Sequence, residues 1–212
     1  MPTDKPLIKS APRGFGGWQQ NLSNAILKLI GWRYEVRLPD VKKYIVIAAP
    51  HTSNADWFMM LLFTRAVNFR LHWAAKDSLF RWPISGLMKT LGGIPINRRE
   101  RTNLTQLVIE AINRSDEIAL AFAPEGTRKK TPYWKSGFYH IALGSGIPIV
   151  MASIDYPSKT ICVNEWFYPS GDPKADMDIV RRFYAGKRGR NAHQYAEPRL
   201  KAELENKDAP EA

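Results

Sequence analysis

His51 and Asp56 are the residues whose types and spacing first indicate acid–base chemistry in this sequence. Five positions along a continuous helix would point the two side chains about 140° apart. If the helix instead begins near Asn54, the turn before it can fold His51 back over Asp56. One imidazole nitrogen would then donate to the carboxylate, leaving the other as a general base. The alternative is an ordinary helix start with an acidic residue near its positive end and an uninvolved His51.

Two further groups of polar residues follow strand-like segments. Arg98 ends the short extended segment 94–98, and the residues Glu125–Arg128 follow the apolar segment 118–122. Because the carboxyl ends of parallel strands gather at one edge of a sheet, we expect both groups to share a cleft with His51.

The residue types in these two groups suit an anionic ligand. Arginine side chains such as Arg98 and Arg128 bind phosphate in a bidentate manner. Gly126 lets the backbone approach a ligand closely, and Thr127 adds a hydroxyl donor. The alternative is that both arginines are solvated loop charges.

Four motifs, taken in order, resemble the four-block pattern of the glycerolipid acyltransferase family, in a short bacterial type. That family includes the lysophosphatidate (1-acylglycerol-3-phosphate) acyltransferases. The motifs are H-x-x-x-x-D from His51 to Asp56, G-x-I-P-I-N-R ending at Arg98, P-E-G-T-R ending at Arg128, and I-P-I-V around Pro148. Together they cover roughly residues 45–155.

The resemblance implies that His51 is the catalytic base and Asp56 its orienting partner. Residues of the second and third motifs would bind the acceptor: Arg98, Glu125, Gly126 and Arg128. The implied activity moves a fatty acyl group from a thioester donor, acyl-CoA or acyl carrier protein, to a hydroxyl of a lysophospholipid such as 1-acylglycerol-3-phosphate. The thioester is then a co-substrate, and no cofactor is expected.

The residues themselves are compatible with this chemistry. A positioned histidine can remove the proton of an attacking hydroxyl, so no Ser or Cys nucleophile is required. The G-x-S-x-G motif of serine hydrolases is absent, and Ser53 is better explained as a helix-capping residue. The other histidines show no ligand spacing with His51, so no metal site is expected.

The elements that position His51 can be inferred from its neighbours. The apolar, β-branched segment 44–49 precedes Pro50 and predicts a buried strand. The apolar segment after Asp56 predicts a buried helix, with good N-cap residues at 52–54. His51 should therefore lie where the carboxyl end of a strand meets the first turn of a helix, where open α/β sheets bind ligands.

Strands and helices alternate along the rest of the chain. We expect a single α/β domain with a largely parallel or mixed sheet flanked by helices, acyltransferase-like in fold. Its predicted parts are a flexible N-terminal arm (1–17), the acyltransferase domain (18–186, opening with an amphipathic helix at 18–32) and a polar, frayed tail (187–212). Predicted strands span 34–38, 44–49, 71–75, 94–98, 118–122, 147–154 and 160–163, and predicted helices span 18–32, 55–68, 77–90, 102–113, 135–143 and 173–184.

Composition narrows the class of partner. Lys plus Arg number 31 against 20 Asp plus Glu, a net charge of +11 that indicates an anionic partner. No nucleic-acid-binding motif is recognisable, so we expect no nucleic acid. No stretch reaches the ~20 apolar residues that span a bilayer. We therefore expect a peripheral protein on the anionic cytoplasmic face of the cell membrane, held by the helix 18–32.

Two alternatives remain open at this point. The helix 18–32 could pack onto the sheet as core instead of contacting lipid. The protein could also be a non-catalytic basic protein that binds anionic lipid or nucleic acid. The single cysteine, Cys162, excludes an intrachain disulfide and is interpreted as a small hydrophobic residue in a strand.

Overall fold

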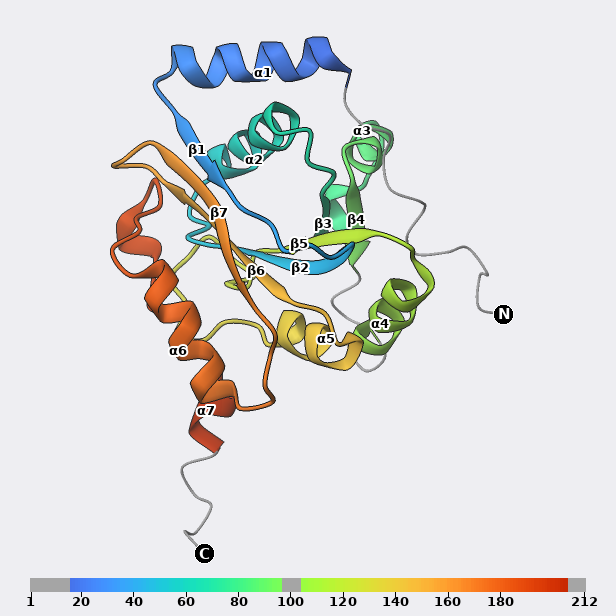
Figure 1. Cartoon of the computed structure of the whole chain (residues 1–212), viewed down its shortest axis with the longest axis vertical. Coiled ribbons are helices and arrows are strands. Elements are labelled where there is room, and N and C mark those ends of the chain that lie inside the picture. Colours follow the sequence, from blue (N-terminus) through green and yellow to red (C-terminus); the bar gives the residue numbers. More distant parts are fainter. Residues whose placement is uncertain (1–15, 97–103, 206–212) are drawn as a thin grey trace, which may run out of the picture.

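A seven-stranded sheet forms the centre of the computed structural model, which describes residues 16–96 and 104–205 (Figure 1). In spatial order the strands are β1 (Arg33–Val36), β7 (Thr160–Phe167), β6 (Ile149–Asp155), β2 (Lys43–Ala48), β5 (Ile118–Phe122), β3 (His72–Lys76) and β4 (Gly93–Ile96). Neighbouring strands are parallel, except for the antiparallel hairpin of β6 and β7. The predicted α/β class with a largely parallel sheet is confirmed.

Helices cover both faces of the sheet. One face carries α1 (Gly17–Leu29), α2 (Ala55–Ala66) and α3 (Ser85–Thr90). The other carries α4 (Leu104–Arg114), α5 (Gly137–Ser145) and α6 (Pro173–Tyr184), with the short α7 (Ala202–Glu205) beside α6.

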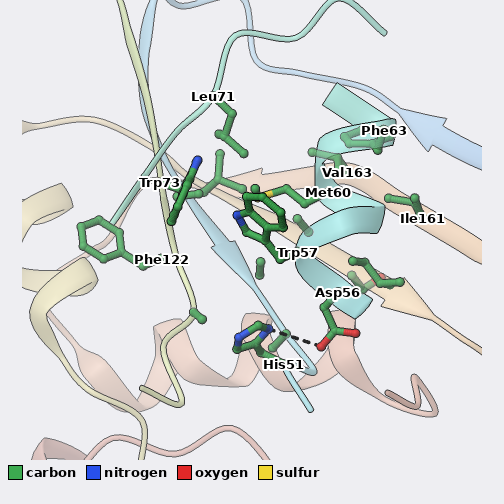
Figure 2. A pocket seen from close by; sticks show the side chains of 18 of the residues that line it. His51, Asp56, Trp57, Met60, Phe63, Leu71, Trp73, Phe122, Ile161 and Val163 are labelled. Atoms are coloured by element: carbon green, nitrogen blue, oxygen red, sulfur yellow. Dashed lines mark ion pairs between the residues drawn. The ribbon is translucent and has the colours of Figure 1, made fainter. Parts of the chain in front are cut away.

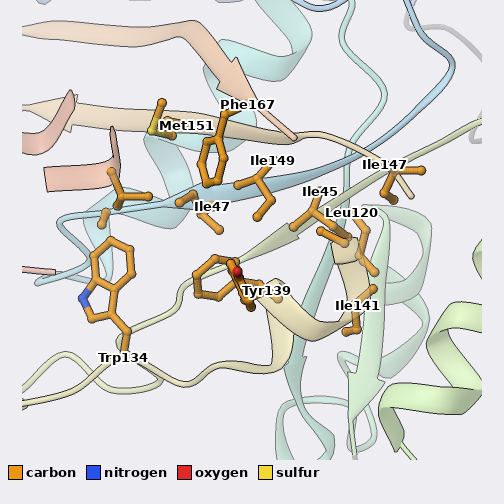
Figure 3. Close-up of a cluster of buried hydrophobic side chains, with 14 of the residues drawn as sticks. Ile45, Ile47, Leu120, Trp134, Tyr139, Ile141, Ile147, Ile149, Met151 and Phe167 are labelled. Carbon is orange, nitrogen blue, oxygen red and sulfur yellow. The ribbon is translucent and has the colours of Figure 1, made fainter. Parts of the chain in front are cut away.

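The central strand β2 is buried on both faces because β6 and β5 flank it and helices lie above and below. Ile45 and Ile47 point into the cluster formed with α4, α5 and α6, which Figure 3 shows around Tyr139. Val46 points the opposite way, into the cluster formed with α1 and α2. This two-sided burial explains why β2 is a continuous apolar run and lacks the alternation of a half-exposed strand.

Short-range sequence features account for the start of α6 and for the place of β4 in the sheet. Asp172 accepts hydrogen bonds from the backbone N–H groups of Lys174 and Ala175, and Pro173 opens α6, as predicted. Pro95 lies in the edge strand β4, which pairs with β3 alone among the described strands, and an edge strand tolerates proline because one of its sides has no ladder partner.

The single helix predicted at 77–90 is wrong. A 3₁₀ helix at Asp77–Leu79 is followed by a separate helix, α3, that begins at Ser85. Pro83 explains the break, because proline has no N–H to donate and disfavours helical backbone at the preceding residue, Trp82.

The frayed tail predicted after residue 186 is also incorrect within the described residues. Leu200 is buried in the core, and the carbonyl of Arg199 accepts a hydrogen bond of 2.8 Å from the N–H of Trp134. The segment was predicted to be frayed because its composition is mostly polar. A few apolar side chains such as Leu200 nevertheless pack into the core and hold it against the domain. In this segment Gly189 lies against Pro50 and Thr52, and Asn191 hydrogen-bonds to Thr52, so the chain after α6 crosses the turn that carries His51.

Candidate active site

The turn 50–56 joins β2 to α2 and brings His51 and Asp56 together. The Nδ1 atom of His51 lies 3.3 Å from Oδ2 of Asp56 (Figure 2). The same oxygen accepts hydrogen bonds of 2.9 Å from the backbone N–H groups of Thr52 and Ser53. Because α2 begins only at Ala55, the turn folds His51 back over Asp56, as predicted.

One of the predicted capping residues contacts the first turn of the helix, since the hydroxyl oxygen of Ser53 accepts a 3.1 Å hydrogen bond from the backbone N–H of Ala55. Asn54 is the N-cap residue, but its side chain makes no capping hydrogen bond. The carboxylate of Asp56 instead reaches back from inside the helix to the N–H groups of Thr52 and Ser53. This carboxylate thus fixes the turn and His51 together, near the positive end of the helix dipole.

Asp56 is almost fully buried, with 4% of its surface exposed. Burial by itself would raise the pKa of its carboxyl group. Hydrogen bonds from His51, Tyr156 and the backbone of Ser53 outweigh that effect and hold the pKa below its ordinary value. Asp56 is therefore ionised at neutral pH and available as an acceptor for His51.

His51 lies at one end of a cavity of about 460 Å³, a volume typical of small-molecule sites. The cavity runs between α2 and the sheet, and most of its lining is apolar (Figure 2), including Trp57, Met60, Phe63, Leu71, Trp73 and Val163. Among the described residues, nothing is hydrogen-bonded to Nε2 of His51. The arrangement combines a histidine that has a carboxylate partner with an apolar chamber.

Glu125 contacts the same turn from the neighbouring strand end. Its Oε2 accepts a 2.8 Å hydrogen bond from the backbone N–H of His51, and the side chain does not line the cavity. Glu125 is 5% exposed, and burial raises the pKa of its carboxyl group to about 7. In the structure Glu125 contacts the backbone of His51. Its predicted role in binding the acceptor stays a prediction.

The raised pKa of Glu125 predicts a pH-dependent stability. The folded state keeps a proton that the unfolded state releases between pH 4.5 and about 7, so the free energy of unfolding should fall as pH rises through this window. The loss amounts to about 3 kcal/mol at most. Glu125→Gln imitates the protonated form and should remove this dependence. Urea unfolding at pH 4.5, 6 and 8 measures it, with the surface variant Glu110→Gln as control; parallel curves for wild type and Glu125→Gln would contradict the prediction.

The other predicted site residues have different placements. Gly126 has a φ of +68°, a backbone conformation that favours glycine. Thr127 is exposed, and its hydroxyl accepts a hydrogen bond from the N–H of Lys129. Arg128 is exposed and lines the cavity that His51 also lines. Arg98 lies outside the described residues, so its place in the cleft stays a prediction.

Sequence reasoning missed two contributors to the site. Tyr156, after β6, donates its hydroxyl hydrogen to Oδ1 of Asp56 at 2.8 Å. Asn191, in the segment that crosses the turn, donates from its side chain to the carbonyl of Thr52 at 2.8 Å. No motif signals either contact, because the partners lie 100 and 139 positions apart.

The described residues contain no group of three or more His, Cys, Asp or Glu side chains that could hold a metal ion. Nor does any helix in the described ranges have the length and apolar character needed to cross a bilayer.

Comparison with known proteins gives consistent matches. The family model described as Acyltransferase matches residues 31–155. The 1-acyl-sn-glycerol-3-phosphate acyltransferase of Escherichia coli (strain K12) is 30% identical in a match covering 64% of this chain and 58% of that protein. The enzyme of the same name from Haemophilus influenzae is 28% identical, covering 65% of this chain and 60% of that protein. The chain thus spans about three fifths of the length of these relatives.

Proposed function

Because the chain belongs to the acyltransferase family, we propose that it transfers a fatty acyl group from a thioester to a hydroxyl of a lysolipid. The observation that carries this proposal is the His51–Asp56 pair at one end of an apolar cavity. The relatives named 1-acyl-sn-glycerol-3-phosphate acyltransferase suggest 1-acylglycerol-3-phosphate as the acceptor. The donor is acyl-CoA or acyl carrier protein.

In the proposed reaction His51 acts as the general base. Its Nε2 takes the proton of the acceptor hydroxyl while that oxygen attacks the thioester carbonyl carbon. The ionised Asp56 stabilises the imidazolium that forms, across the 3.3 Å contact to Nδ1. When the tetrahedral intermediate collapses, the carbon–sulfur bond breaks and the departing thiolate takes up the proton. The products are the ester and a free thiol.

The cavity supports a long-chain substrate. Trp57, Met60 and Phe63 follow one another along α2, so the apolar wall extends about 9 Å along the helix axis, from the rise of ~1.5 Å per residue. An acyl chain placed there loses contact with water along its length, which is favourable by ~0.8 kcal/mol per buried CH₂ group. The reactive carbonyl would then lie near His51.

Arg128 is proposed to bind the phosphate of the acceptor. Arg128 is exposed and lines the same cavity as His51. Arginine matches phosphate oxygens with two parallel hydrogen bonds. The motif that ends at Arg98 is proposed to contribute a second cation.

A thiol-release assay with long-chain acyl-CoA and a panel of lysolipids tests the function. Release that depends on an acceptor, together with a diacyl product in the mass spectrum, is the expected result. Binding of anionic vesicles or nucleic acid without any turnover, with acyl carrier protein as well as with acyl-CoA, would favour the non-catalytic alternative.

The orientation of α1 supports a peripheral membrane position. Two of its side-chain amides face the protein, since Gln20 and Asn24 both donate to the carbonyl of Ala66 at the end of α2, at 3.1 and 3.0 Å. Most of its large apolar side chains face outward, with Trp18 69%, Leu22 51% and Leu29 86% exposed, whereas Leu27 is buried against the domain. A helix that turns its apolar side away from its own domain suits the interface of a bilayer.

We therefore expect Trp18→Ser with Leu29→Ser to lose binding to anionic vesicles. Full burial of such side chains is worth ~1.5–3 kcal/mol each, so even half of that makes binding about tenfold weaker or more. Vesicle flotation measures the loss. The control is Leu107→Ser with Leu143→Ser, two exposed leucines on the opposite face of the sheet. If the α1 variant is folded and floats like wild type, α1 is not the anchor.

A further inference from the structure

We propose that Tyr156 is a positioning residue for the His51–Asp56 pair, whose hydroxyl fixes the carboxylate of Asp56 in the orientation that His51 requires. Tyr156 lies in the turn between β6 and β7, one position beyond the residues 31–155 that match the family. Its hydroxyl donates to Oδ1 of Asp56 at 2.8 Å.

The two oxygens of Asp56 have different partners. Oδ2 accepts from the backbone N–H groups of Thr52 and Ser53 and faces Nδ1 of His51. Oδ1 has the hydroxyl of Tyr156 as its hydrogen-bond partner among the described residues. The terminal torsion of an aspartate is broad, so partners on one oxygen leave the plane of the carboxylate poorly determined. A fixed donor on the second oxygen determines that plane.

The position of Tyr156 is itself determined by its surroundings. Its backbone N–H donates to the carbonyl of Arg188 at 3.0 Å, and the N–H of Arg188 donates to Oδ1 of Asp155 at 2.8 Å. Its ring meets the ring of Trp32 edge to face, with centroids 5.2 Å apart. The hydroxyl is therefore held in place before any substrate binds, as a supporting residue of a site must be.

Charge makes this hydrogen bond stronger than a neutral one. The contact with Tyr156 is among the interactions that keep the pKa of Asp56 low against the effect of burial. Burial, and then the bond to Asp56, raise the pKa of Tyr156 above its ordinary value of 10.0. The hydroxyl thus remains a protonated donor to an ionised acceptor at neutral pH.

The first test is kinetic and rests on the proposed acyl transfer. Tyr156→Phe keeps the ring and removes the hydroxyl. We expect kcat to fall about tenfold, with the KM of donor and acceptor each within about twofold, because the geometry of the base is disturbed and not substrate binding. In an Asp56→Ala background the same change should have no further effect, since Tyr156 would act through Asp56.

Tyr139 provides a matched control on the other face of the sheet. Its hydroxyl also donates to a buried carboxylate, Oδ2 of Asp176, at 2.7 Å. Tyr139→Phe should lower the melting temperature about as much as Tyr156→Phe while leaving kcat unchanged. A general loss of stability would instead lower kcat in both variants.

A second measurement does not depend on turnover. The ¹⁵N signals of the His51 imidazole, assigned by comparison with His51→Ala, report which ring nitrogen carries the proton. We expect a protonated Nδ1 in wild type and in Tyr139→Phe, and signals shifted toward a mixture of tautomers in Tyr156→Phe. If the wild-type protein shows no acyl transfer, the proposed function is contradicted, but the ¹⁵N measurement still tests the role of Tyr156. Wild-type ¹⁵N shifts in Tyr156→Phe, or a kinetic effect that persists undiminished in the Asp56→Ala background, would overturn the role of Tyr156.

Discussion

His51→Ala should reduce acyl transfer by at least ~10²–10⁴-fold, the contribution of a positioned general base. The proposed reaction offers no other group to take the proton of the acceptor hydroxyl. The imidazole is 28% exposed, and its contact is to Asp56, so its removal leaves no large cavity in the core. The rate of thiol release at saturating acceptor measures the loss, and a melting curve checks that the fold is retained.

Two comparisons sharpen this result. Asp56→Asn should cost less than His51→Ala, because the base remains and only its orientation and the stabilisation of the imidazolium are lost. His140→Ala removes an exposed histidine of α5 and should leave turnover unchanged. Wild-type turnover in His51→Ala would refute the base role.

The second large effect is expected at Arg128. Arg128→Ala should raise the KM of a phosphorylated acceptor about ten- to a hundredfold, because a charge-assisted hydrogen bond contributes ~1.5–3 kcal/mol. The KM of the thioester should change little. Initial rates with each substrate varied in turn, at saturation of the other, separate the two constants.

Lys130 supplies the control for Arg128. It is an exposed cation two positions further along the same loop, and it does not line the cavity. Lys130→Ala should leave both KM values within about twofold. If Arg128→Ala raises the KM of the thioester and not that of the acceptor, Arg128 belongs to the donor site.

The local arrangement around His51 follows from short-range features of the sequence. Pro50 ends the strand, and α2 starts close enough behind it for Asp56 to reach the N–H groups of Thr52 and Ser53. These contacts span three and four positions, so short-range geometry is enough to fix them. The same holds for Asp172 at the start of α6, and for the alternation of strands and helices that predicted the fold class.

The distant groups that complete the site are brought together by the packing of the whole domain. Tyr156 and Asn191 reach the turn because β6 lies beside β2 and because the chain after α6 crosses the turn. In the sequence these two polar residues cannot be told from ordinary surface residues. Local sequence patterns do not indicate contacts between residues 100 positions apart.

The orientation of α1 was likewise beyond sequence analysis. Its periodicity reveals an apolar and a polar side but not which of them lies on the protein. The apolar side was equally compatible with core packing. In the structure the side-chain amides of Gln20 and Asn24 donate to the carbonyl of Ala66 at the end of α2, where the helix itself supplies no N–H donor. That contact turns Trp18 and Leu29 outward, and it exists only once α1 and α2 have packed together.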